Sequence, residues 1–96
     1  MRTVYLVCYD ICDDRRLRQV YKTMRGAGDH LQYSVFRCDL SRRELAELVA
    51  NLSPLLDHGV DQVLIVDLGP TDGRAGTCIE ALGRPYTAPE RHAIVI

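Results

Sequence analysis

Two stretches of this 96-residue chain are apolar at both even and odd positions, and they constrain the fold more than any other feature. They cover residues 2–10 and 61–68. Strands with this pattern are buried on both faces of their sheet, whereas a strand with one solvent face alternates apolar and polar residues. A chain of this length forms one small domain with a thin core. Both faces of one sheet must therefore be covered by very little chain.

Two amphipathic helices are predicted between these strands. The first begins at the N-cap Asp13 and ends at Gly26, with apolar residues at helical spacing in between. The second begins at a capping box whose N-cap is Ser41, and its apolar stripe extends to Leu56. Pro54 is expected to kink this helix or to begin a separate final turn.

The segment between the helices decides the fold class. Residues 30–40 are rich in strand-forming residues, but periodicity alone does not show whether they form one strand or two. A compact solution splits residues 29–40 into a hairpin that turns at Tyr33-Ser34. The order is then βαββαβ, the ferredoxin-like α+β arrangement, with two helices on one face of an antiparallel sheet. One domain over residues 1–96 is expected.

Two helices cover one face, so the second face of the sheet needs another partner. A second copy of the chain, stacked sheet on sheet, is the simplest candidate. Extra C-terminal strands are predicted over residues 77–82 and 92–96. The tail from about residue 85 to residue 96 is expected to pair with the sheet or with the partner subunit, because an apolar edge strand needs a neighbour.

The charge is divided unevenly along the chain. Residues 1–43 hold nine Lys or Arg and five Asp or Glu, a net charge of +4, although the whole chain has a net charge of −1. The basic half is where phosphates would be attracted. The longest apolar run near the start, residues 4–9, is far shorter than the about 20 residues that span a bilayer. We therefore expect a cytoplasmic protein with no membrane partner.

Acidic and basic residues follow the first strand directly. They are Asp10, Asp13, Asp14, Arg15, Arg16 and Arg18. Mg²⁺ prefers oxygen ligands and takes one or two carboxylates together with substrate phosphate, and arginines can hold the phosphate oxygens. The set therefore suits metal-assisted hydrolysis of a phosphodiester. The alternative is structural: the aspartates cap and turn the chain, and the arginines form a solvated helix face. The rings of Tyr9, Tyr33 and Phe36 either stack on bases or belong to the core or an interface.

Two blocks of the sequence resemble the CRISPR-associated protein two family, the small protein of the spacer-acquisition module. Residues 4–16 read VYLVCYDICDDRR, which is similar to the family's strand, Tyr-Asp-Ile-x-Asp-Asp and basic helix. Residues 28–38 read GDHLQYSVFRC, which is similar to its Gln-x-Ser-Val-Phe segment. The two blocks lie at the family's separation, and the resemblance extends from residue 1 to about residue 84.

The resemblance implies a ferredoxin-like homodimer in which Asp10 of each subunit faces its twin and holds one Mg²⁺ or Mn²⁺. Family members are described as metal-dependent endonucleases on single-stranded RNA or double-stranded DNA, and as the dimer that bridges CRISPR integrase subunits. Arg16 and Arg18 match basic positions of the family helix, whereas Gln19 stands where a further Lys or Arg is common. Candidate supporting residues in the two blocks are Tyr9, Ser34 and Phe36.

Two functions from different classes follow. In the first, the protein is a hydrolase in which Asp10 binds the metal and the residues Arg15, Arg16 and Arg18 bind nucleic acid. In the second, it is a scaffold that binds duplex DNA and the integrase, and Asp10 is structural. The same residues serve both functions, so the sequence does not separate them.

Overall fold

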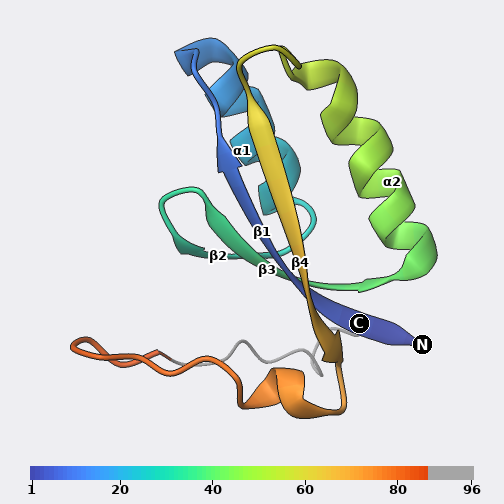
Figure 1. Cartoon of the computed structure of the whole chain (residues 1–96), viewed down its shortest axis with the longest axis vertical. Helices are drawn as coiled ribbons and strands as arrows, with labels where there is room; N and C mark the ends of the chain where they lie inside the picture. The colour runs from blue at the N-terminus through green and yellow to red at the C-terminus, as the bar shows by residue number, and fades with distance from the viewer. Residues whose placement is uncertain (87–96) are drawn as a thin grey trace.

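Four strands and two helices follow one another in the predicted βαββαβ order (Figure 1). The computed structural model describes residues 1–86. The elements are β1 (Arg2–Asp10), α1 (Asp14–Arg25), β2 (Asp29–Gln32), β3 (Val35–Ser41), α2 (Arg42–Leu52) and β4 (Gln62–Pro70). A 3₁₀ turn over Ser53–Leu55 contains Pro54 and follows α2, so the separate final turn is confirmed.

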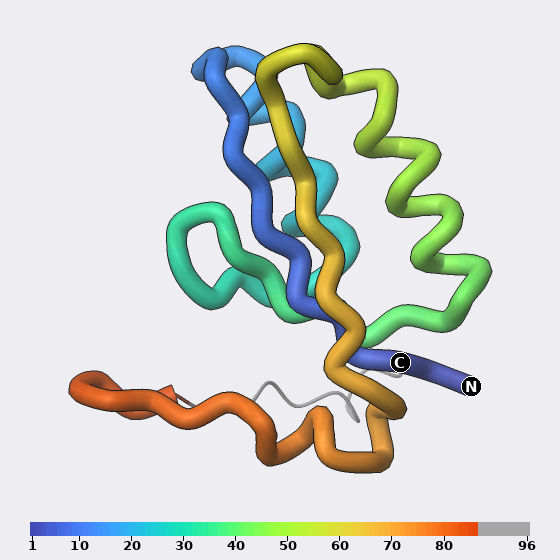
Figure 2. Tube along the Cα trace, in the orientation of Figure 1, coloured from blue at the N-terminus to red at the C-terminus, as the bar shows by residue number. Residues whose placement is uncertain are grey.

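The sheet has the strand order β2-β3-β1-β4, and every pair of neighbours is antiparallel. β1 is central, as its apolar pattern predicted: Val7 lies opposite Phe36 on β3 and opposite Ile65 on β4. β4 and the β2–β3 hairpin form the two outer parts of the sheet (Figure 2). The predicted hairpin turn at Tyr33-Ser34 is confirmed, because β2 ends at Gln32 and β3 begins at Val35.

Both helices pack on one face of the sheet, which we call the helical face. The core on this face is formed by Tyr5, Val7, Tyr9, Val20, Met24, Phe36, Cys38, Leu40, Leu48 and Leu52. The predicted caps are present: the Asp13 carboxylate accepts a hydrogen bond from the backbone of Arg16 at 2.9 Å, and Ser41 forms a capping box with Glu44. No helix within residues 1–86 is long and apolar enough to cross a lipid bilayer.

The chain passes very close to β3 at Gly28, between α1 and β2. A Cβ atom at Gly28 would lie 2.5 Å from the Cys38 sulfur and 2.6 Å from the Arg37 carbonyl oxygen. Real Cβ atoms do not approach other atoms this closely, so a side chain at this position would force the chain at residue 28 and β3 apart. The glycine therefore allows the tight connection from the helix into the hairpin.

The opposite, non-helical face is apolar and only partly covered. Alternate residues point to opposite faces of a strand, so Leu6, Cys8 and Asp10 of β1 share this face with Leu64 and Val66 of β4. Leu64 and Val66 are 53% and 44% exposed. Across the sheet, the β2–β3 half of the face lies beside the segment after β4, which forms a groove with it. Among residues 1–86, none packs over the β4 half of this face, which we call the uncovered half.

The predicted strand over residues 77–82 is wrong. These residues have no regular secondary structure, and the segment runs below the β2–β3 hairpin in Figure 1. Ile79 and Tyr86 line a groove with Leu6, Leu31 and Val35, so the segment packs by side chains against the sheet face instead of pairing by its backbone at an edge. The predicted strand over residues 92–96, and most of the tail that was expected to pair, lie outside the described residues.

Candidate functional site

Asp10 closes β1 and is exposed. It lies opposite Gln62 of β4, on the same non-helical face as Leu64 and Val66. At this end of β1, Asp10 pairs with β4 alone, because the pairing of β1 with β3 ends at Cys8, and its carboxylate reaches solvent. Asp10 is therefore an exposed acid at the end of β1, and its predicted role as a metal ligand stays a prediction.

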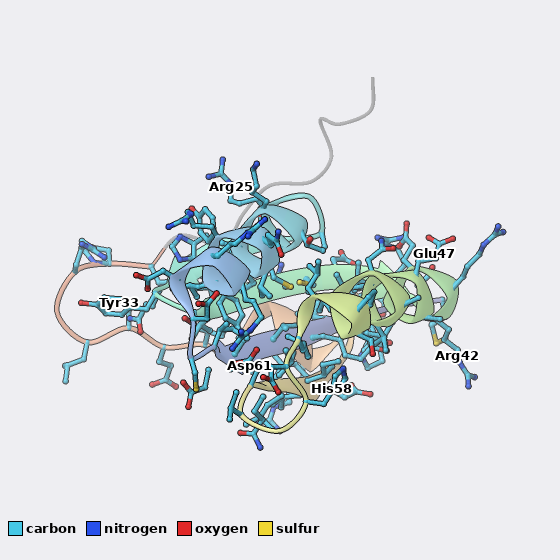
Figure 3. The ribbon with its side chains drawn as sticks, turned by 90° about the horizontal axis from the view of Figure 1, so that it is seen from above. Arg25, Tyr33, Arg42, Glu47, His58 and Asp61 are labelled. Carbon is cyan, nitrogen blue, oxygen red and sulfur yellow. The ribbon has the colours of Figure 1, made fainter. Side chains whose placement is uncertain are left out.

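A buried carboxylate, Asp61, fixes the strand end that carries Asp10. Its side chain is 0% exposed and accepts a hydrogen bond of 2.7 Å from the Nε of Arg16 and one of 2.9 Å from the backbone N–H of Cys12. A further N–H, that of Asp57, donates to it at 2.9 Å. The loop after β1, the first turn of α1 and the turn before β4 thus meet at one carboxylate. Figure 3 views the molecule from above, relative to Figure 1, and shows Asp61 near its middle.

Arg16 is directed toward Asp61. Its second contact, from Nη2 to Asp61 Oδ1, is 3.2 Å long, so the guanidinium binds the carboxylate with two nitrogens. The hydrogen bond from Arg16 is the largest cause that holds the pKa of Asp61 well below its usual range, and Asp61 in turn raises the pKa of Arg16. The phosphate contact predicted for Arg16 stays a prediction. The geometry shows an internal role, which is to hold the end of β1.

We expect an Asp61→Asn variant to unfold at a lower temperature than the wild type at neutral pH, by several degrees, because Arg16 then loses its charged partner in a buried position. The pKa of Asp61 is lower in the folded state, so its contribution to stability is present above the ordinary carboxyl value. That contribution begins to fall as the pH drops below about 4, and it is lost completely only below the depressed pKa of Asp61 in the folded state. The difference in unfolding temperature should therefore shrink on acidification. Circular dichroism melts at several pH values measure it.

The control for this prediction is Asp72→Asn, an exposed carboxylate in the loop after β4. It should melt like the wild type at every pH. If the Asp61→Asn variant had the same unfolding temperature as the wild type at neutral pH, the contacts of Arg16 with Asp61 would not stabilise the fold.

The exposed cations of α1 form a row. Arg15 and Arg18 are three positions apart and Lys22 is four further on, which places them on one side of the helix. All three are exposed, and within residues 1–86 none of the ion pairs involves them. Gln19 lies beside the row, and together with these three cations it lines a groove between α1 and the β2–β3 turn. Arg15 and Arg18 are thus exposed cations, and their predicted binding of phosphate stays a prediction.

The three candidate supporting residues join the hairpin to β1 next to Asp10. The backbone N–H of Tyr9 donates to the carbonyl oxygen of Ser34 at 3.1 Å. The Tyr9 ring stacks on Phe36 with a centroid distance of 6.2 Å. Phe36 is 0% exposed and Tyr9 is 7% exposed, and burial raises the pKa of Tyr9. These two rings belong to the core, and a base cannot stack on a ring as buried as Phe36.

The sequence did not single out Asp61. It stands directly before β4, where it looks like the first residue of a strand, and its partners Cys12 and Arg16 lie far away in the chain. An acid before a strand and an arginine in a helix give no local pattern that would connect them.

A sheet in the order β2-β3-β1-β4 with both helices on one face defines the ferredoxin-like class of α+β proteins. Within this class, an exposed acid at the end of β1 beside a basic α1 is the arrangement that the sequence resemblance implied. The family model described as CRISPR associated protein Cas2 matches residues 1–74. The chain belongs to the Cas2 family.

Relatives and solved structures agree with this assignment. The chain is 41% identical to CRISPR-associated endoribonuclease Cas2 1 of Rhodospirillum rubrum, over 96% of this chain and 89% of that protein. It is 36% identical to CRISPR-associated endoribonuclease Cas2 of Geobacter sulfurreducens over the full length of both. Its fold is similar to that of the hypothetical protein TT1823 from Thermus thermophilus, with a TM-score of 0.76, 32% identity, and coverage of 88% of this chain and 94% of that one. The Streptococcus pyogenes Cas2 structure gives a TM-score of 0.71 at 28% identity, with coverage of 83% and 99%.

Proposed function

We propose that this Cas2 protein acts in CRISPR adaptation as a homodimeric, metal-dependent endonuclease that hydrolyses phosphodiester bonds of nucleic acid. The observation that carries the proposal is the position of Asp10. It is exposed at the end of a central strand, it faces the uncovered side of the sheet, and the basic row of α1 begins five residues later. RNA is the favoured substrate because the relatives are named endoribonucleases, and double-stranded DNA is the second. A cytoplasmic location belongs to the same proposal.

Asp10 fits a Mg²⁺ or Mn²⁺ ion as one oxygen ligand. No group of three His, Cys, Asp or Glu side chains that could hold a metal ion occurs in the described part of the chain. A second carboxylate from a second copy would bring the number of protein ligands to two, which suits an ion that keeps most of its waters. When bound, such an ion lowers the pKa of a coordinated water and neutralises charge on a phosphate. Asp10 would hold the ion, and Arg15 and Arg18, which lie on the helical side of the sheet, would hold phosphates of the same nucleic acid away from the ion.

The uncovered half of the non-helical face supports the homodimer. Leu64 and Val66 expose apolar side chains there, and β4 is an edge strand of nine residues. Exposed apolar faces and long edges of this kind are normally covered by a partner. Asp10 lies on the same face, so a two-fold axis through this surface would bring the two Asp10 side chains toward each other.

The second candidate is a non-catalytic scaffold that binds duplex DNA and bridges CRISPR integrase subunits. The basic row of α1 favours it, because contacts to phosphates alone are enough to hold a duplex. In this function Asp10 has no role in chemistry. If the protein is a scaffold, an Asp10→Asn variant should still capture spacers. If it is an endonuclease, the same variant should lose cleavage of nucleic acid.

We expect Leu64→Glu to convert the protein from the mass of two chains to the mass of one and to abolish cleavage with it. Leu64 is half exposed in the single chain, so the fold accepts a glutamate there, but a dimer would have to bury the charge without a partner. Size-exclusion chromatography with light scattering at micromolar concentration measures the mass.

The matched control is Val49→Glu on α2. Val49 is 43% exposed and lies on the helix layer, away from the non-helical face, so this variant should keep the mass and the cleavage of the wild type. A Leu64→Glu protein that stays dimeric would place the interface on another surface. A wild type that is monomeric with and without magnesium would refute the shared metal site.

A further inference from the structure

An open groove of about 680 Å³ lies between α1 and the β2–β3 turn. The rings of Tyr9, Tyr21 and Tyr33, together with Leu17, give it apolar walls. Arg15, Arg18 and Lys22 line it as well, so three positive charges surround an apolar floor. Its size is within the range of sites for small organic ligands, about 300–1,000 Å³. The groove is on the helical side of the sheet, and Asp10 is on the other.

Tyr33 is the most exposed of the three tyrosine rings that line this groove, and Tyr21 is partly buried. The Tyr33 side chain is 93% exposed, in contrast with the buried rings of Tyr9 and Phe36. Figure 3 shows Tyr33 at the periphery of the molecule, on the far side from Arg42. Large aromatic side chains are rarely this exposed without a partner.

The backbone at Tyr33 is fixed, and it directs the side chain into solvent at the hairpin turn. Within residues 1–86, Tyr33 is the one residue other than glycine with a positive φ, of 30°. Its carbonyl oxygen accepts a hydrogen bond from Nε2 of His30 at 2.6 Å. The His30 ring in turn packs edge-on against Tyr21 and lies 4.8 Å from Phe36. A bulky residue in this backbone region is uncommon, and such residues cluster at ligand sites.

The positive charges that line the groove favour a negatively charged ligand. Arg15, Arg18 and Lys22 form no ion pair within residues 1–86, so they are available to an anion. A nucleotide unit combines a flat ring with an adjoining phosphate, which matches an exposed tyrosine beside a row of cations. The faces of a base in a duplex are covered by its neighbours, whereas an unpaired base offers a free face.

We propose that this groove binds one unpaired nucleotide of single-stranded nucleic acid, with its base stacked on Tyr33 and the adjoining phosphates held by Arg15, Arg18 and Lys22. The inference rests on the nucleic-acid role proposed above and deepens it, because it assigns a base-binding site outside the Asp10 face. Stacking is tolerant of base identity, so the groove discriminates unpaired from paired bases and does not read sequence.

The test is binding of a fluorescently labelled 12-nucleotide single strand, measured by anisotropy in EDTA so that no metal-dependent cleavage occurs. Tyr33→Asn removes the ring and keeps a residue type that tolerates positive φ. It should weaken binding of the single strand about 10-fold. Tyr33→Phe keeps the ring and should bind like the wild type.

Two further ligands separate stacking from phosphate contact. A duplex of the same sequence should bind Tyr33→Asn and the wild type equally. A single strand with abasic sites should also fail to distinguish the two proteins. Equal weakening on all three ligands, or no weakening on the base-containing single strand, would overturn the base-binding site. A wild type that binds none of the three would refute the proposed nucleic-acid role itself, and with it this site.

Discussion

An Asp10→Asn variant is expected to lose Mg²⁺-dependent cleavage of RNA by at least about 100-fold while it keeps the fold and the mass of the wild type. Asparagine has nearly the same shape as aspartate but carries no charge, so it binds a divalent cation poorly. Metal-ion chemistry contributes several kcal/mol to such reactions, and each 1.4 kcal/mol is about a tenfold change in rate. Within residues 1–86 the Asp10 side chain makes no hydrogen bond, so the fold does not depend on it. A cleavage time course with and without EDTA measures the effect.

Asp67→Asn is the matched control for this substitution. Asp67 is an exposed acid on β4 whose Oδ1 accepts a hydrogen bond from the N–H of Gly69, and an asparagine keeps that acceptor oxygen. This variant should cleave like the wild type. If Asp10→Asn and the wild type cleaved equally, the activity would come from a contaminating nuclease and Asp10 would have no catalytic role.

Phe36→Ala is expected to lower the free energy of unfolding by about 3–5 kcal/mol, a large part of the 5–15 kcal/mol typical of a whole domain. Phe36 is completely buried, and its ring lies 4.8 Å from His30, 5.8 Å from Tyr21 and 6.2 Å from Tyr9, measured between centroids. Removing it leaves a cavity between α1 and the hairpin. Urea unfolding followed by far-UV circular dichroism gives the difference.

Phe36→Leu keeps most of the buried apolar volume and should be much less destabilising than the alanine variant. An alanine variant as stable as the wild type would mean that the ring cluster does not stabilise the fold. The same experiment separates stability from function, because Phe36→Leu should retain cleavage if Phe36 acts only through packing.

Local patterns predicted the elements that local interactions form. The first strand, the N-cap Asp13 and the capping box at Ser41 all agree with the structure. The strand expected over residues 77–82 was wrong because a strand needs a neighbour to bond with, and its own composition does not show whether one is present. The hairpin within residues 29–40 needed the family resemblance, since its periodicity fits one strand or two.

The candidate site was predictable where one short segment forms it. Asp10, Arg15 and Arg18 lie within nine residues, and the strand and helix that carry them were both recognised. The bond between Arg16 and Asp61 joins residues 45 positions apart, so no window of sequence contains it. The same holds for the groove, where Tyr33 of the hairpin turn meets residues of α1.

The buried Asp61 also has a consequence for synthesis on the ribosome. The bond from Cys12 to Asp61 spans 49 positions, and β4, which flanks β1, begins only after it. Contacts this distant in sequence form late, because the chain between them must first be closed into a loop. A nascent chain of about half length contains β1 and α1 but not yet Asp61, the residue whose carboxylate bonds to the turn between them. Asp10, the proposed metal ligand, thus becomes rigid only once translation of β4 is finished.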